Sequence, residues 1–228
     1  MAKPVPANLL QEQLAYYRAR AGEYDESVLR TGRFAGPGLP EVDAEWQHLI
    51  DAVRALPPCE SALELACGTG IWTAKLLNIA ETILALDGAA EMLEVNRAKV
   101  GSPRVTYQHV DLFHWQPAST YDLVLAGFWL SHVPPGLLPA HIEQVAKAVR
   151  PGGRLFFADE PAGGRQLSGP VEGEFKQTRS VHDGSSYRIV KVYHDPDALA
   201  AQLKPLGFAE VQIWRGDYFF YLDARRTV

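Results

Sequence analysis

The densest group of residues suited to ligand binding is the string Leu63-Glu64-Leu65-Ala66-Cys67-Gly68-Thr69-Gly70. Gly68 and Gly70 let the backbone turn tightly and approach a ligand closely, because neither carries a Cβ atom. A dinucleotide fingerprint needs a third glycine, whereas this chain has Thr73 in that place. Trp72, a bulky residue at the start of the expected helix, would also crowd a pyrophosphate. The string therefore predicts a ligand loop, but not a dinucleotide-binding one.

Candidate proton acceptors follow two later apolar runs. His132 comes just past the run 121–126, and Glu160 just past the run 154–158. Histidine is suited to removing a proton near neutral pH, and a carboxylate can orient an amine or act as a base. His132 could equally order its own loop, and Glu160 could cap the loop that follows it. No short metal-ligand spacing such as H-E-x-x-H occurs, so a metal site is not indicated.

Short apolar runs that alternate with helical patterns would position these residues. This alternation is typical of right-handed βαβ crossovers and a mostly parallel sheet. Most of these runs are continuously apolar, as expected for strands that helices cover on both faces. Such sheets bind ligands beyond the carboxyl ends of their strands, where the glycine string and His132 lie. The expected strands are 61–66, 82–86, 105–110, 121–126 and 154–158, with helices over 71–78, 91–100 and 139–149.

The two ends of the chain depart from this alternation. Residues 9–29 and 41–56 have helical patterns, whereas 174–181 and 187–194 flank a turn and predict an antiparallel hairpin. Asp195-Pro196 predicts the start of a helix, and a second hairpin is expected over 209–222. One domain spanning 1–228 accommodates these elements. Its expected parts are a helical cap (1–56), a ligand-binding core (61–160), a substrate-side insertion (161–195) and a C-terminal helix and hairpin (196–228).

Composition limits the kinds of partner. The 228 residues include 27 Asp and Glu against 22 Lys and Arg, which gives a net charge of −5. An acidic chain without a basic run is poorly suited to DNA or RNA, since such binding rests on phosphate neutralisation. Two cysteines exclude a disulfide framework. Because we find neither a targeting segment nor an apolar stretch near the roughly 20 residues of a membrane span, we expect a cytoplasmic monomer or homodimer that binds a small molecule.

The ordered set of motifs resembles that of the class I S-adenosylmethionine-dependent methyltransferases. The string E-x-A-C-G-T-G resembles their first motif, Tyr121–Ala126 their fourth-strand motif, and Arg150-Pro151-Gly152-Gly153 the turn before their fifth strand. The resemblance covers nearly all of residues 61–222. It implies a Rossmann-like α/β fold, a three-layer sandwich. Its sheet would be seven-stranded and mostly parallel with an antiparallel last strand, joined by a helical N-terminal cap and an inserted β-hairpin.

The resemblance also implies a site for S-adenosylmethionine. Asp87 stands where the family's acidic residue accepts hydrogen bonds from both ribose hydroxyls, which suits a carboxylate. Asp111 and the amide that follows stand where the family binds the adenine edge. Tyr17 and Arg33 of the cap could hold the methionyl carboxylate. The expected cofactor-binding residues are Tyr17, Arg33, Glu64, Ala66, Gly68, Thr69, Gly70, Asp87, Gly88, Met92, Asp111, Leu112, Phe113 and Phe128.

Two absences favour a small-molecule acceptor. After the fourth strand this chain has Ala126-Gly127-Phe128-Trp129, not the Asn/Asp-Pro-Pro-aromatic string of the members that methylate base amines. The paired glutamates of the protein arginine members are missing as well. We therefore expect O- or N-methylation by in-line displacement, in which the protein mainly positions donor and acceptor and excludes water. The expected catalytic residues are His132 and Glu160, and the expected substrate-binding residues are Trp129, Tyr187 and Tyr193.

Three other functions remain open at this point. Relatives of the fold use the same cofactor for chemistry other than methyl transfer, or bind it as non-catalytic subunits. A tRNA or protein acceptor would call for strong, salt-dependent binding that the acidic charge disfavours.

Overall fold

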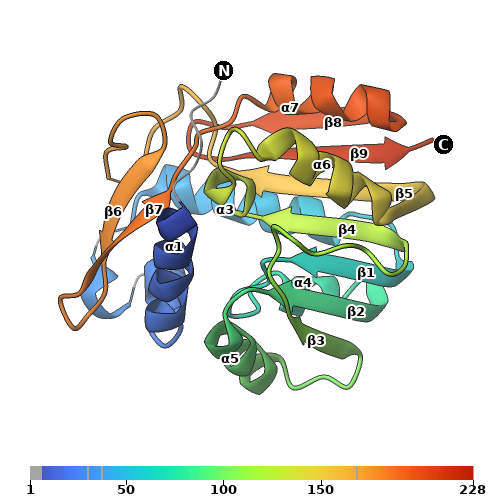
Figure 1. Cartoon of the computed structure of the whole chain (residues 1–228). Coiled ribbons are helices and arrows are strands. Elements are labelled where there is room, and N and C mark those ends of the chain that lie inside the picture. Colours follow the sequence, from blue (N-terminus) through green and yellow to red (C-terminus); the bar gives the residue numbers. More distant parts are fainter. Residues whose placement is uncertain (1–6, 30, 37, 168, 228) are drawn as a thin grey trace.

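A seven-stranded sheet forms the centre of the molecule in a computed structural model, which describes residues 7–29, 31–36, 38–167 and 169–227 (Figure 1). The strand order is β3-β2-β1-β4-β5-β9-β8. β1 to β5 run parallel, and β9 runs antiparallel to both of its neighbours, β5 and β8. The strands of this sheet are β1 (Cys59–Leu65), β2 (Ala80–Asp87), β3 (Val105–His109), β4 (Tyr121–Gly127), β5 (Val149–Asp159), β8 (Phe208–Arg215) and β9 (Phe220–Arg226).

Helices cover both faces of the sheet, which confirms the predicted Rossmann-like three-layer fold. The α-helices are α1 (Ala7–Arg20), α2 (Tyr24–Leu29), α3 (Pro40–Arg54), α4 (Thr73–Leu76), α5 (Ala90–Val100), α6 (Leu138–Lys147) and α7 (Pro196–Leu203). Three 3-10 turns are η1 (Gly32–Phe34), η2 (Leu130–His132) and η3 (Lys204–Leu206). No helix among the described residues is long and apolar enough to cross a bilayer.

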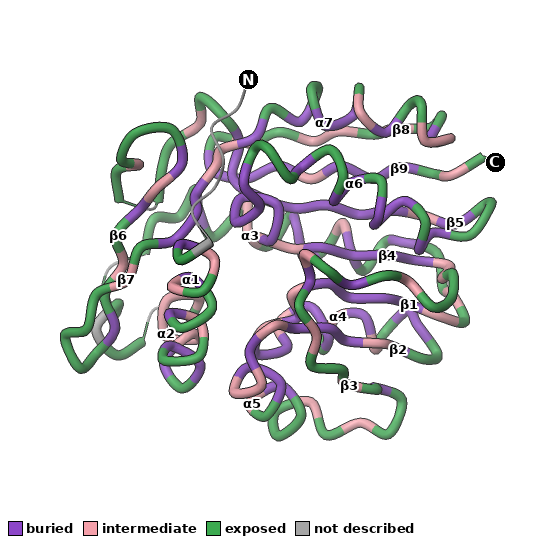
Figure 2. Tube along the Cα trace, in the orientation of Figure 1, coloured by how far each residue is buried: buried purple, intermediate pink, exposed green. Residues whose placement is uncertain are grey.

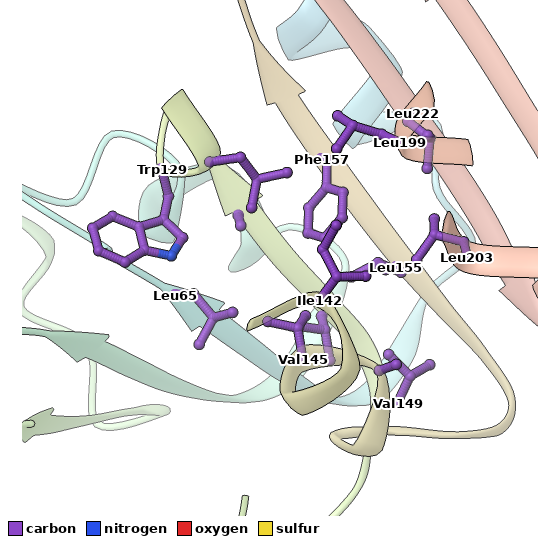
Figure 3. Close-up of a cluster of buried hydrophobic side chains, with 14 of the residues drawn as sticks. Leu65, Trp129, Ile142, Val145, Val149, Leu155, Phe157, Leu199, Leu203 and Leu222 are labelled. Carbon is purple, nitrogen blue, oxygen red and sulfur yellow. The ribbon is translucent and has the colours of Figure 1, made fainter. Parts of the chain in front are cut away.

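Alternation along the strands divides the apolar core in two. On β5, Leu155 and Phe157 pack under α6 and α7, whereas Phe156 packs under α3 on the other face. This period of two follows from the pleat of the strand. Figure 2 shows the central strands buried along most of their length, and Figure 3 shows Ile142 and Leu203 from the covering helices beside Leu155. Two covered faces hold the carboxyl ends of the strands in fixed positions.

The predicted inserted hairpin is present as a separate two-stranded sheet of β6 (Lys176–Ser180) and β7 (Ser186–Val190). It lies beyond the carboxyl ends of the parallel strands, next to α1 (Figure 1). The Glu12 carboxylate of α1 accepts hydrogen bonds from the Arg188 guanidinium and backbone amide, and the Gln13 side chain accepts one from the Val190 amide. The hairpin and α1 therefore form one cap over the sheet.

Several predicted boundaries move by a few residues. The largest difference is the helix expected over 71–78, of which only α4, four residues long, is α-helical. The Asn78 side chain donates to the carbonyls of Ala74 and Lys75, and β2 starts at Ala80, so the helix has no room to continue. The helix predicted from Asp195-Pro196 forms as expected, since the Asp195 carboxylate caps it by accepting from the Asp197 amide.

Candidate active site

Two cavities meet at the carboxyl ends of β1 and β4. The first, of about 580 Å³, lies over the ends of β1 to β4 beside α1, and we call it the strand-end cleft. The second, of about 470 Å³, lies under α1, α2 and the hairpin, and we call it the cap cavity. Residues common to both cavities are Tyr17, Tyr24, Ala66, Gly68, Gly127, Phe128 and His132. A ligand that filled both would therefore cross this shared wall.

The backbone at the shared wall adopts an uncommon conformation. Ala66, directly after β1, has φ of 50°, and Phe128, directly after β4, has φ of 56°. Residues other than Gly, Asn and Asp rarely take this left-handed form, and such strain concentrates at functional sites. β1 and β4 are neighbours at the point where the strand order reverses, which is where open parallel sheets bind ligands.

Asp87 organises the glycine loop from the end of β2. Its carboxylate accepts hydrogen bonds from the backbone amides of Gly68, at 2.9 Å, and Ala89, at 2.8 Å. Burial raises the pKa of this carboxyl to about 6, although these bonds favour the charged form. Asp87 lines the strand-end cleft and its oxygens retain further lone pairs, so they can accept from the hydroxyls of a bound ligand.

Glu64 lies beneath the glycine loop. One carboxylate oxygen accepts from the Thr73 hydroxyl at 2.6 Å, and the other, Oε1, is buried without a partner among the described residues. Burial raises the Glu64 pKa to about 8. Gly70 is also required here, since a Cβ atom at its φ of 90° would lie 2.4 Å from Asn96 Oδ1. The loop is held from below by side chains that line neither cavity.

The far side of the strand-end cleft is aromatic. Phe113 and Trp129 both line it, with their ring centroids 5.4 Å apart. The Trp129 indole donates to His141 Nε2 at 2.8 Å, and burial lowers the pKa of His141 to about 4, which keeps this nitrogen free to accept. Trp129 is thereby fixed against the cleft that Asp87 lines, and it does not line the cap cavity.

Among the residues that the structure describes, three cationic side chains line the cap cavity: Arg20 from α1, Arg179 from β6, and Lys191 directly after β7. The Arg20 guanidinium is buried, donates to the hydroxyls of Tyr16 and Ser27, and keeps Nε without a hydrogen-bond partner. Among the described residues, no carboxylate lies within ion-pair distance of Arg20 or Arg179. Burying the Arg20 cation without a counter-ion costs free energy, and Arg179, half-buried and bonded to the Gln177 side chain, adds a second positive charge, so the cavity fits an anionic ligand.

The Lys191 charge, unlike those of Arg20 and Arg179, has carboxylate partners among the described residues. Its ammonium lies 3.3 Å from Glu160 Oε2 and 4.0 Å from Asp159 Oδ1, and all three side chains are buried. Burial raises the Glu160 pKa. Asp159 also accepts from the backbone amides of Ser131 and Glu160, which ties the ends of β4 and β5 together. The predicted catalytic residue Glu160 thus lines the cap cavity as the partner of a lysine.

His132 lies on the shared wall with both ring nitrogens engaged. Nδ1 lies 2.8 Å from the Val190 carbonyl, and Nε2 lies 2.8 Å from the Tyr17 hydroxyl. Burial and the nearby Lys191 charge lower the His132 pKa to about 3. The imidazole is therefore neutral, donates from Nδ1 to the carbonyl, and accepts the Tyr17 hydroxyl proton at Nε2.

The structure brings most of the predicted site residues together. The predicted cofactor residues that line the strand-end cleft are Tyr17, Ala66, Gly68, Asp87, Gly88, Met92, Asp111, Leu112, Phe113 and Phe128. Thr69 lines the cap cavity, and its hydroxyl lies 2.5 Å from Asp25 of α2. Glu64 and Gly70 support the loop from below, and the side chain of Arg33 lies outside the described part of the chain.

The expected substrate-binding residues are not brought together. Trp129 lines the strand-end cleft, and Tyr187 and Tyr193 are not among the described residues that line either cavity. Tyr187 packs on Tyr16, 6.0 Å between centroids, and the Tyr193 ring lies under the Lys191 ammonium. Sequence reasoning missed Arg179 and Lys191. Their signal is positional, because they share a hairpin face with Gln177 and Ile189, which are buried.

Three comparisons bear on this site. The family model of a methyltransferase domain matches residues 62–153. Among curated proteins, a demethylmenaquinone methyltransferase of Bacillus licheniformis is 32% identical over 120 residues, and one of Lysinibacillus sphaericus is 31% identical over 135 residues. The first match spans 49% of this chain and 49% of that protein, and the second spans 54% and 55%. The chain therefore aligns with about half the length of these curated relatives.

Solved structures match over almost the whole chain. DhpI in complex with SAM and HEP has a TM-score of 0.82 and 34% identity, covering 97% of this chain and 100% of that one. The DhpI complex with S-adenosylhomocysteine (SAH) has a TM-score of 0.81 and 34% identity, covering 97% of this chain and 98% of that one. The N-methyltransferase NodS of Bradyrhizobium japonicum, bound to SAH, has a TM-score of 0.67 at 13% identity, covering 94% of this chain and 98% of that one, and so shares the fold.

Proposed function

Because the chain belongs to the class I S-adenosylmethionine-dependent methyltransferases, we propose that it transfers the methyl group to an ionised oxygen of a small anionic acceptor. The strand-end cleft fits the cofactor. Its glycine loop leaves space for a ligand, the Asp87 carboxylate can accept from ribose hydroxyls, and Phe113 and Trp129 can flank a base. When bound, S-adenosylmethionine supplies an electrophilic methyl group on a sulfonium.

The observation that carries this proposal is the pair of guanidinium groups, Arg20 and Arg179, that face the cap cavity without carboxylate partners among the described residues. Arginine matches carboxylate and phosphate-type oxyanions with paired hydrogen bonds. The curated relatives are named for demethylmenaquinone, but they align with about half of the chain. The charge of the acceptor is therefore inferred from the side chains that line the cap cavity.

An anionic acceptor also explains why the site needs no base. His132 was the expected proton acceptor, yet its pKa near 3 and its two engaged nitrogens suit it poorly to that task. An acceptor oxygen that is already ionised has no proton to lose. The transfer then forms the new C–O bond as the C–S bond breaks, and the electron pair leaves with the sulfur.

His132 and Tyr17 take a positioning role in this proposal. Because His132 Nε2 accepts its proton, the Tyr17 hydroxyl presents its lone pairs to the shared wall, where the methyl group must pass. Burial holds the Tyr17 pKa well above its ordinary value, so the hydroxyl stays neutral. The side chains of the cap meanwhile exclude water from the displacement.

The test is SAH formation with matched acceptors. The purified chain is incubated with S-adenosylmethionine and, separately, phenylacetate, benzylphosphonate, benzyl alcohol and benzylamine. We expect turnover with at least one anion and none with the neutral or cationic analogues. Equal turnover of benzyl alcohol or benzylamine would contradict an oxyanion acceptor, while leaving the methyltransferase assignment in place.

A further inference from the structure

A second wall of the cap cavity, built from other elements than those that carry the cations, is aromatic. It consists of Trp46 from α3, Trp72 before α4, Phe128 after β4 and Phe219 before β9, and we call it the aromatic wall. The Trp46 ring centroid lies 5.5 Å from those of Trp72 and Phe128 and 5.8 Å from that of Phe219. Four rings from four separate segments thus converge on one surface of the cavity.

The aromatic wall is fixed in place. Trp72 and Phe219 are buried, and Trp46 and Phe128 are half-buried where they face the cavity. Gly127 lets the Trp72 indole lie against the backbone, since a Cβ atom there would come within 2.3 Å of Trp72 Nε1. Phe128 meets Phe219 edge to face at 5.5 Å, a favourable arrangement of two rings. A fixed aromatic surface binds a flat apolar group without having to rearrange.

Three exposed apolar side chains line the cap cavity towards solvent, beside the exposed Asp43. They are Phe34, Leu39 and Leu167, which are 40%, 49% and 43% exposed. An oxyanion held by arginines gains nothing from such a border, whereas an apolar group does. Cavities of about 300–1,000 Å³ enclose ligands of drug size, and the cap cavity, at about 470 Å³, is larger than a bare oxyanion needs.

We propose that the acceptor is an amphiphile. Its anionic group lies at Arg20, Arg179 and Lys191, and an aromatic or similarly flat apolar group lies against the aromatic wall. The location of the anionic group rests on the proposed function, whereas the apolar group rests on the rings alone. The apolar group also sets the orientation of the oxyanion relative to Tyr17, so that it contributes to positioning as well as affinity.

The test uses calorimetric titration of the SAH-saturated protein with two matched pairs of probes, and with benzyl alcohol as a neutral aryl control. The pairs are acetate with phenylacetate, and methylphosphonate with benzylphosphonate. We expect the aryl member of each pair to bind at least tenfold more tightly than its methyl partner. Trp46→Ala should remove most of this ratio while leaving the affinity for methylphosphonate within about twofold.

Two further variants show whether the aryl preference is lost because the aromatic wall is changed or because the fold is disturbed. Trp214→Ala removes a tryptophan that stacks on His48 and Tyr221 outside both cavities, and should keep the wild-type ratio. Trp46→Leu retains apolar volume without a flat ring, and should give an intermediate ratio even where Trp46→Ala folds poorly.

The outcomes distinguish this inference from the proposed function. Equal affinity of aryl and methyl anions, or an aryl advantage that survives Trp46→Leu unchanged, overturns the amphiphile. Benzyl alcohol binding as tightly as phenylacetate overturns the anionic acceptor and leaves the aromatic wall as a binding surface. Tighter binding of the aryl anions than of their methyl partners and of benzyl alcohol, with most of the aryl-to-methyl ratio lost in Trp46→Ala, supports both proposals.

Discussion

The strand-end cleft takes its glycine loop, Asp87 and Asp111 from the ends of neighbouring strands, with α1 along one side, whereas the cap cavity is assembled mainly from segments at opposite ends of the chain. Asp87 reaches the Gly68 amide across 19 positions of sequence. The cap that encloses the second cavity is held by contacts of longer range, such as the hydrogen bond from the Val190 amide to Gln13, 177 positions away. Under the proposed function, recognition of the cofactor would therefore rest mainly on short local motifs, and recognition of the acceptor on how distant elements pack. Substitutions that affect one cavity and spare the other test this division.

The largest effect is expected from Asp87→Ala. The cofactor loses an acceptor for its ribose hydroxyls, and the amides of Gly68 and Ala89 lose theirs, so the Kd for SAH should rise by about 100-fold. Titration calorimetry measures this directly, with Asp51→Ala on the exposed face of α3 as the control. An unchanged Kd would mean that the strand-end cleft is not the cofactor site.

Arg179→Gln should act on the other cavity. We expect kcat/KM for the best anionic probe to fall by about 30-fold, since a hydrogen bond to a charged group is lost, with the Kd for SAH within twofold of wild type. Lys176→Gln is the control, because it removes a positive charge from the same strand at a residue that lines neither cavity. Steady-state kinetics would contradict the division if Arg179→Gln weakened cofactor binding as strongly as acceptor use.

The cofactor site should also respond to mild acid. The Asp87 pKa is raised to about 6, so below this pH the carboxyl gains a proton and becomes a weaker acceptor for ribose hydroxyls. The affinity for SAH should therefore be highest above pH 6. Below pH 6 it should decrease with falling pH, by at most about tenfold for each pH unit. Asp87→Asn should give a flat profile between pH 5 and 7, and persistence of the slope in that variant would assign it to another group.

The smallest effect concerns the wall that both cavities share. The folded-state pKa of His132 is lowered from 6.5 to about 3, so between these values the unfolded chain takes up a proton that the folded chain does not. This histidine therefore removes stability as the pH falls below 6.5. When the pH is lowered from 7 to 5.5, the unfolding free energy of the wild type should fall by about 1 kcal/mol more than that of His132→Gln.

Urea denaturation at the two pH values measures this difference. Tyr17→Phe removes the hydroxyl that donates to Nε2 but keeps the ring nitrogen buried, and it should retain the wild-type acid sensitivity. Identical pH dependence of wild type and His132→Gln would show that His132 is not held neutral in the folded chain.

Most of the sheet and the strand-end cleft could be predicted because their signals are local. The glycine string and Asp87 directly follow apolar runs, Asp111 follows the edge strand β3, and a parallel sheet brings such ends together. The length of α4 could not be predicted, since it depends on the Asn78 side chain capping the carbonyls before it.

The lining of the cap cavity could not be predicted, because it depends on contacts between distant segments. Tyr187 and Arg179 are register partners on adjacent strands, yet Arg179 lines the cap cavity and Tyr187 packs on Tyr16. Which of the two faces a ligand depends on how the hairpin docks on α1, and no local pattern specifies that. Trp129 was assigned to the acceptor from its place after β4, but its hydrogen bond to His141 fixes it in the other cavity.

The bonds between α1 and β7 also bear on how the molecule is made. Glu12 and Arg188, which join α1 to the hairpin, lie 176 positions apart, so during synthesis α1 is made long before the strand that it packs against. Contacts of such long range form late, because the intervening chain must first be closed into a loop. The segment from Glu64 to Phe128 has its own strand pairings and needs no such delay. A growing chain should therefore acquire a place for its cofactor well before it has one for its acceptor.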